Sequence, residues 1–144
     1  MNLFTIDFEC FFDRDYTLSK LNSSTYVRDE RYQTHMVGIQ KNGGAPVVLT
    51  DAQFRQLLPK LNLENSAVLC HHAQFDGLIL QHHYGVRPKF FLDTLSMSRA
   101  VYPGAKSHSL KALAERLNLP PKGDELINTI GKRITASSPF CNFF

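Results

Sequence analysis

The chain begins with alternating apolar and polar side chains, the pattern of a β-strand with one buried face. The alternation covers residues 3–10. One face contains Phe4, Ile6, Phe8 and Cys10, and the other contains Leu3, Thr5, Asp7 and Glu9. The pattern therefore predicts a first strand that presents two carboxylates, two residues apart, on the side away from its apolar face.

A second and a third strand are predicted on either side of an Asn-Gly turn. Residues 35–40 and 45–50 have strand-like composition, and the sequence KNGG separates them. Asn-Gly favours a tight hairpin turn because both central residues adopt positive φ. The polar, aperiodic residues 11–34 precede this hairpin and leave room for a short helix.

A short helix is predicted directly after the hairpin. Thr50 or Asp51 can cap its N-terminus. Its apolar face contains Phe54, Leu57, Leu58 and Leu61. Pro59 should end or kink this helix because proline lacks the backbone N–H that the helix needs.

Strands and helices alternate in the remaining pattern. Residues 67–70 (AVLC) are typical of a buried strand, and the helix that follows has Asp76 in its first turn. The apolar face of that helix is predicted to contain Phe75, Leu78, Ile79 and His82. A strand at 89–94 and helices at 93–102 and 109–117 follow, the last capped by Ser107 or Ser109. This order favours a mixed α/β sheet covered by helices on both faces.

The composition excludes some classes of protein but does not indicate a function. The chain has 144 residues, 43% of them hydrophobic, and a net charge of +3, which suits one globular domain and neither requires nor excludes nucleic acid. The three cysteines include no CxxC pair, so we expect no disulfide framework or zinc ribbon and a reducing, cytoplasmic location. No apolar run reaches the ~18 residues of a membrane span.

The acids of the first strand suggest a metal site. The backbones of Asp7 and Glu9 would lie ~6.6 Å apart on one face. A divalent cation would remove the repulsion between the two carboxylates, and oxygen ligands suit Mg²⁺ or Mn²⁺. A simpler interpretation is that both acids face solvent. Likewise, Asp76 could serve only to stabilise the first turn of its helix.

Other polar residues favour structural roles. Adjacent histidines on one helix point about 100° apart and lack a Cys or acid to complete a zinc site, which applies to His71, His72, His82 and His83. His108 is expected to cap or pack a helix, and Asp93 to be structural. A basic and aromatic set could contact a single nucleic-acid strand, although a solvated insertion is favoured. This set contains Arg14, Tyr16, Lys20, Tyr26, Arg28, Arg31, Tyr32 and Lys41.

Four segments together resemble the DEDD superfamily of 3′–5′ exonucleases, and most closely the proofreading domains of bacteriophage family A DNA polymerases. They are IDFEC (6–10), HHAQFD (71–76), FLDTLSMSRA (91–100) and HSLKALAERL (108–117). The resemblance extends over about residues 1–133. It implies a ribonuclease H-like fold, in which three antiparallel strands are extended by two parallel ones.

The resemblance also implies an activity. Asp7, Glu9 and Asp76 would be the acids of the first two motifs, holding two Mg²⁺ or Mn²⁺ ions that hydrolyse 3′-terminal phosphodiesters of single-stranded DNA. A polymerase domain is an expected partner, in a bacterial or phage-infected cytoplasm. Cys10 and His72 replace the usual Thr and Asn and, with Phe8, would line the terminal-nucleotide pocket. Alternatively, Phe8 and Cys10 are core residues.

The family's third motif, a Tyr or His followed four or five residues later by Asp, is not found after Arg133. Residues 134–144 form an atypical uncharged tail. We therefore expect an exonuclease domain at 1–133 that lacks this motif, as in a truncated or frameshifted gene, and has impaired activity. A catalytically inactive nucleic-acid-binding or polymerase-interaction remnant is the alternative, and an RNase H-like endonuclease is a third possibility.

Overall fold

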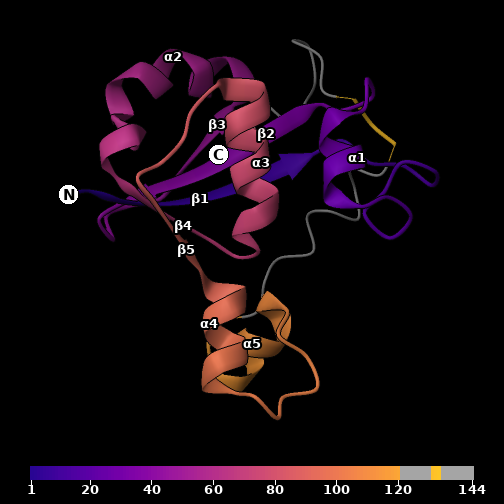
Figure 1. Cartoon of the computed structure of the whole chain (residues 1–144), viewed down its shortest axis with the longest axis vertical. Coiled ribbons are helices and arrows are strands. Elements are labelled where there is room, and N and C mark those ends of the chain that lie inside the picture. The colour runs from indigo at the N-terminus through magenta and orange to yellow at the C-terminus, as the bar shows by residue number, and fades with distance from the viewer. Residues whose placement is uncertain (121–130, 134–144) are drawn as a thin grey trace.

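The computed structural model describes residues 1–120 and 131–133, and these contain one five-stranded mixed sheet (Figure 1). The strands are β1 (Leu3–Cys10), β2 (Thr34–Lys41), β3 (Val47–Thr50), β4 (Ala67–Cys70) and β5 (Phe90–Asp93). The helices are α1 (Ser23–Arg28), α2 (Asp51–Leu61), α3 (Ala73–Tyr84), α4 (Thr94–Val101) and α5 (Leu110–Arg116), with a 3₁₀ turn at Leu63–Asn65. Within the described ranges, every helix is too short or too polar to cross a bilayer.

The order of the strands across the sheet is β3-β2-β1-β4-β5. β1 pairs antiparallel with β2, and β2 with β3, whereas β4 and β5 are added in parallel. The predicted arrangement of three antiparallel and two parallel strands is confirmed. β1 pairs with β4 only from Leu3 to Thr5, while its pairing with β2 continues to Cys10. The second half of β1 therefore extends beyond the end of β4.

The hairpin between β2 and β3 turns where the sequence predicts. Asn42 and Gly43 have φ values of 51° and 71°, and the Gly44 N–H donates to the Lys41 carbonyl over 2.9 Å. A left-handed conformation at two successive residues is sterically cheap for Asn and Gly. Local turn chemistry is therefore sufficient to specify this connection.

The apolar face of β1 forms the centre of the core, as its alternation predicts. Phe4 and Ile6 are each 1% exposed, and the Phe8 ring packs against rings from two helices. These are Phe54 of α2, at a centroid distance of 5.8 Å, and Tyr84 of α3, at 5.6 Å. Both helices thus cover the same face of the sheet. Figure 1 shows α4 and α5 beyond the β5 edge.

Two details of the helices differ from the sequence pattern. Pro59 lies inside α2, which ends two residues later at Leu61, with Asn62 in the left-handed conformation. In α3 the buried residues are Ala73, Asp76, Ile79 and Leu80, so only Ile79 of the predicted face is buried. Phe75 and Leu78 are only half-buried and His82 is exposed. The helix is rotated so that Asp76 points toward the sheet, which hydrophobic periodicity does not indicate.

The tyrosines of the insertion between β1 and β2 are core residues. Tyr16 is fully buried and stacks on Tyr26, with a centroid distance of 4.3 Å. The Tyr16 hydroxyl donates to the Tyr26 carbonyl over 2.6 Å, and the Tyr26 hydroxyl to the Phe11 carbonyl over 2.5 Å. These two rings are therefore not available to stack on nucleic-acid bases.

The described segment 131–133 lies against the carboxyl end of β1. The Gly131 N–H donates to the Phe12 carbonyl over 2.8 Å. Arg133 lies over the Phe11 ring at 4.3 Å and donates to the Arg31 carbonyl over 3.2 Å. The chain thus returns from α5 to the end of β1. The predicted uncharged tail at 134–144, and with it the prediction that the third motif is lacking, concerns residues outside the described ranges.

Candidate metal-binding active site

The candidate site is at the carboxyl end of β1, where β1 extends beyond β4. Pleating places Asp7 and Glu9 on the face opposite the core, with Asp7 exposed and Glu9 half-buried. Their neighbours Phe8 and Cys10 are 6% and 9% exposed. The predicted alternation of buried and acidic positions is therefore present at this end of the strand.

Asp76 reaches the same strand from α3. Its side chain is 3% exposed, and its Oδ1 accepts a long hydrogen bond of 3.4 Å from the Phe8 backbone N–H. That N–H is not taken up by β4, because β4 pairs with β1 only as far as Thr5. The carboxylate of Asp76 thus lies beside the stretch of β1 between Asp7 and Glu9.

The turn that delivers Asp76 has an unusual backbone. His72 precedes α3 with φ 75° and ψ 57°, in the left-handed region, and its side chain makes no capping hydrogen bond. Asn adopts this conformation most readily among residues with a side chain, and His is also enriched there. The left-handed backbone at position 72 therefore explains why this position has a histidine, one of the residue types that tolerate positive φ.

Burial and negative charge act together on Asp76. Burial, and after it the negative charge of Asp7, raise the pKa of its carboxyl to about 7, and the hydrogen bond from the Phe8 N–H opposes this rise. A divalent cation would offset both unfavourable influences on the ionised form, and the available donors are carboxylate oxygens, which suit Mg²⁺ or Mn²⁺. The pair Asp7–Asp76 is thus chemically suited to bind such an ion.

The expected single pocket formed by three carboxylates is not found. Among residues 1–120 and 131–133, no group of three His, Cys, Asp or Glu side chains is close enough around one point to hold an ion. Asp7 and Glu9 project from one face of β1, whereas Asp76 approaches along its edge. The structure brings Asp7 and Asp76 into electrostatic contact, and Glu9 as a metal ligand stays a prediction.

Asp93 has the arrangement of a structural residue, in line with its predicted role. Its Oδ1 accepts from the backbone N–H groups of His72, at 2.8 Å, and Leu95, at 3.1 Å, and its Oδ2 accepts from the Ser96 hydroxyl at 2.7 Å. Burial acts to raise its pKa, yet these hydrogen bonds hold the pKa below its ordinary value. Asp93 caps α4 and ties it to the start of α3.

Phe8 and Cys10 are core residues that also border a pocket of about 200 Å³. Burial raises the pKa of the Cys10 thiol to about 12, so it is not a nucleophile near neutral pH. Glu9, Phe12, Leu18 and Phe75 are further parts of the lining. His72 is not among the lining residues. Phe12, Leu18 and Phe75 were not assigned to this pocket from the sequence. Leu18 is 47% exposed, but this exposure depends on tertiary contacts and could not be predicted from the local sequence.

His108 is packed as predicted, and His83 also makes structural contacts. The His83 ring stacks on Tyr32 at a centroid distance of 4.0 Å, and its Nε2 lies 2.7 Å from the Val27 carbonyl oxygen. The His108 Nδ1 is 3.1 Å from the Ser98 hydroxyl, which links α4 to the loop before α5. Ser109, and not Ser107, caps α5.

Comparison with known proteins identifies the fold. No family model and no curated protein sequence matches the chain. Brucella melitensis NrnC with bound Mg²⁺ matches with a TM-score of 0.62 and 20% identity, over 94% of this chain and 61% of that chain. The NrnC structure bound to pGG matches with a TM-score of 0.57 and 19% identity, over 93% of this chain and 56% of that chain.

Escherichia coli RNase D, an exoribonuclease involved in structured RNA processing, matches with a TM-score of 0.60 and 14% identity, over 93% of this chain and 33% of that chain. The chain thus spans about three-fifths of the NrnC chain with bound Mg²⁺. These matches confirm the ribonuclease H-like mixed sheet as a fold shared with nucleases. They give no support for a specific closeness to phage polymerase proofreading domains.

Proposed function

We propose that this chain is a metal-dependent nuclease that removes nucleotides from the 3′ end of single-stranded nucleic acid. The observation that supports it is the buried Asp76 beside Asp7, at the carboxyl end of the central strand of a sheet that nucleases share. A buried carboxyl next to a second one, with its pKa raised to about 7, destabilises the fold when ionised, and carboxyls perturbed in this way cluster at functional sites.

Each acid has a distinct part in the proposed site. Asp7 and Asp76 would share one divalent ion, and Glu9 would bind a second ion from the same face as Asp7. When bound, Mg²⁺ or Mn²⁺ supplies an activated water and neutralises charge on the scissile phosphate. The Phe8 N–H holds the Asp76 carboxylate against β1. Phe8, Cys10 and Glu9 border the pocket of about 200 Å³ that would hold the terminal nucleotide. A contact of His72 with that nucleotide stays a prediction.

The proposal covers two substrate types, RNA and DNA, and different observations favour each. The resemblance of the motifs to proofreading domains favours single-stranded DNA. A solved neighbour is bound to pGG, and another is an exoribonuclease, which favours short RNA. We infer single-stranded 3′ ends as the common substrate class. A polymerase domain remains a proposed partner for the DNA alternative.

The test uses the purified chain with 5′-labelled single-stranded DNA and RNA of equal sequence. With Mn²⁺ or Mg²⁺ we expect a ladder that shortens from the 3′ end, and no products in EDTA. Asp76→Asn should abolish the ladder, whereas Glu64→Gln, which removes an exposed acid outside the site, should leave it unchanged. Absence of products from both substrates, or equal activity of Asp76→Asn, would refute the proposal. Cleavage of a circular substrate would indicate an endonuclease instead.

A second candidate is a nucleic-acid-binding module without catalysis. The lack of a three-residue metal-binding group within the described ranges favours it. Such a module would bind single strands with the same affinity in EDTA and in Mn²⁺. Calorimetric titration with Mn²⁺ separates the candidates, because the nuclease should bind the ion at a site that Asp7→Asn removes.

A further inference from the structure

A second groove runs along the outer side of α3, close to the candidate site but outside it. It has a volume of about 480 Å³, within the range of ordinary ligand pockets. Gln74, Gly77 and Gln81 of α3 are among the residues that line it, with Ser24 of α1 and Phe91 of β5 also in the lining. Neither the proposed catalytic acids nor the pocket at Phe8 contribute to it.

Phe91 supplies a fixed and accessible aromatic ring. It is 41% exposed although it belongs to a strand of the central sheet. Its ring tip packs on Gly77 so closely that a β-carbon on Gly77 would lie 3.0 Å from the Phe91 Cζ. Only glycine allows this approach without a shift of the ring. The ring is thus supported by the helix on one side and open to solvent on another.

The polar groups around Phe91 are neutral. Gln74 and Gln81 present side-chain amides seven residues apart, about 10 Å along the helix, and Ser24 adds a hydroxyl. Amides and hydroxyls can both donate and accept hydrogen bonds, which matches the edges of nucleobases. The lining contains no carboxylate, so a phosphate backbone would meet no direct repulsion there.

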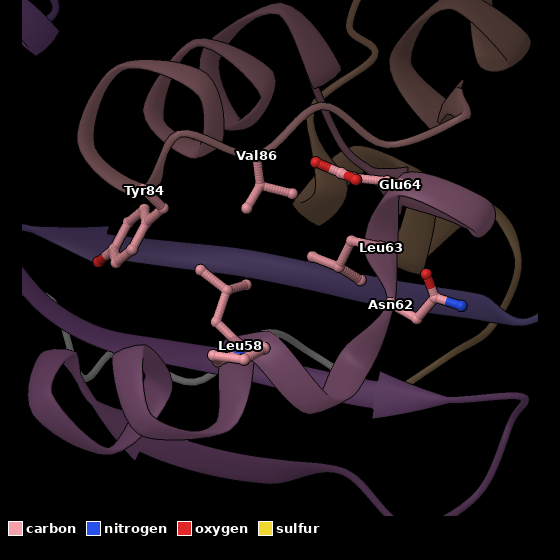
Figure 2. Close-up of a pocket in the computed structure, with 7 residues that line it drawn as sticks. Leu58, Asn62, Leu63, Glu64, Tyr84 and Val86 are labelled. Atoms are coloured by element: carbon pink, nitrogen blue, oxygen red, sulfur yellow. The ribbon is translucent and has the colours of Figure 1, made fainter.

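Another pocket near α3 has a different character. Figure 2 shows it between α2 and the C-terminal end of α3, with Leu58, Leu63, Tyr84 and Val86 around it. It has a volume of about 430 Å³ and includes the carboxylate of Glu64. Its acid and its distance along α3 from Asp76 make it unsuitable for a nucleic-acid strand.

Two of the elements that line the groove at Phe91, α3 and β5, also carry residues at or near the candidate site. Gly77 follows Asp76 in α3, and Phe91 precedes Asp93 by two residues in β5. The Asp93 side chain in turn accepts from the backbone of His72, at the start of α3. The groove therefore lies on the helix that carries Asp76 and next to the strand that carries Asp93.

We propose that this groove binds a base of single-stranded nucleic acid, upstream of the 3′-terminal nucleotide, by stacking on Phe91 and by hydrogen bonds to Gln74 and Gln81. The inference rests on the proposed function for its choice of ligand. It extends that function by assigning a second base site, which would make binding depend on the length of the oligonucleotide.

The test measures binding without hydrolysis, in EDTA, using fluorescence anisotropy of 5′-labelled oligonucleotides of two and six nucleotides. Phe91→Leu should weaken binding of the six-nucleotide strand about tenfold and leave the dinucleotide within about twofold, since aromatic stacking contributes ~1–3 kcal/mol per base. The matched control is Phe90→Leu, which removes a ring that is 50% exposed on the opposite face of the same strand and should have no effect.

Equal losses in Phe91→Leu and Phe90→Leu, or no loss in Phe91→Leu, would overturn the proposal. So would an absence of oligonucleotide binding, or self-association in gel filtration that Phe91→Leu abolishes, because the groove would then serve a second copy of the chain. Gln81→Ala provides a second variant at an exposed position in case Phe91→Leu lowers stability. Hydrolysis with an unaffected Phe91→Leu would leave the proposed function intact and refute only the groove.

Discussion

The Phe8 backbone N–H donates to the Asp76 carboxylate across 68 positions of sequence, at 3.4 Å. This contact exists because β4 stops pairing with β1 at Thr5, which leaves the edge of β1 open for the helix that follows β4. One hydrogen bond thus places an acid from α3 between two acids of β1. The hydrogen bond is long and therefore weak, and Asp76 is buried. The bond thus positions the carboxylate but does not compensate the cost of burying its negative charge.

Asp76→Asn should increase stability at alkaline pH. The pKa of Asp76 is raised from 3.8 to about 7 in the folded chain, so between these values the folded state binds more protons than the unfolded state. Stability should therefore fall as pH rises from about 4 to about 7 and change little above that through this group. Without metal, Asp76→Asn should be more stable than wild type at pH 8 by on the order of 1–4 kcal/mol.

Urea unfolding in EDTA at pH 4.5, 6 and 8 measures this effect. The difference between Asp76→Asn and wild type should be smallest at pH 4.5, where the wild-type carboxyl is protonated. A variant that is less stable than wild type at pH 8 would show that the carboxylate is already well compensated in the folded chain.

Added Mn²⁺ should stabilise the wild type more at pH 8 than at pH 6. Protons compete with the ion for Asp76, whose pKa lies at about 7. At a metal concentration of ~100 times Kd the gain should be about 2.7 kcal/mol. Thermal unfolding with and without Mn²⁺ tests this, with Asp7→Asn expected to lose the gain and Glu64→Gln to keep it. An equal gain in all three proteins would place the ion elsewhere.

Asp7→Asn should lower the pKa of Asp76, because the negative charge of Asp7 is the main electrostatic influence that raises it after burial. Carboxyl ¹³C chemical shifts followed through a pH titration would measure the change directly. Glu9→Gln should have a smaller effect on this pKa, because Asp7 is the neighbouring acid that acts most strongly on Asp76. If Glu9→Gln lowered the pKa of Asp76 more than Asp7→Asn does, Glu9 and not Asp7 would be the main charge acting on Asp76.

Asp93→Ala should destabilise the fold and leave the metal affinity of the remaining site within about twofold. It removes the acceptor of three hydrogen bonds, one from His72 at the start of α3 and two from Leu95 and Ser96 of α4, and a lost cap typically costs ~0.5–2 kcal/mol. Urea unfolding and Mn²⁺ titration of the same sample separate the two roles. Asp93→Asn, which keeps acceptor oxygen, should recover most of the stability. A strong loss of Mn²⁺ binding in Asp93→Asn would identify Asp93 as a ligand.

The sequence by itself was sufficient for features that depend on neighbours along the chain. Alternation in β1 and the Asn42–Gly43 turn follow from local steric and hydrogen-bonding preferences. The sequence offered two candidates for each helix cap, and the structure shows that Thr50 and Ser109 are the caps. The mixed sheet follows from the order of these elements, and the comparison with solved nucleases confirms it. Asp93 was predicted only to be structural, and the structure adds that it caps α4 through the Leu95 N–H.

Only the tertiary structure determined what each acid contacts. The rotation of α3 that buries Asp76, the early end of β4 that leaves the Phe8 N–H for it, and the burial of Tyr16 and Tyr26 depend on contacts between residues far apart in sequence. Periodicity reports which side of a helix is apolar on average, but not which side packs on the sheet. The electrostatic pairing of Asp7 with Asp76 was decided by that packing, because like charges interact strongly only where burial removes water from between them.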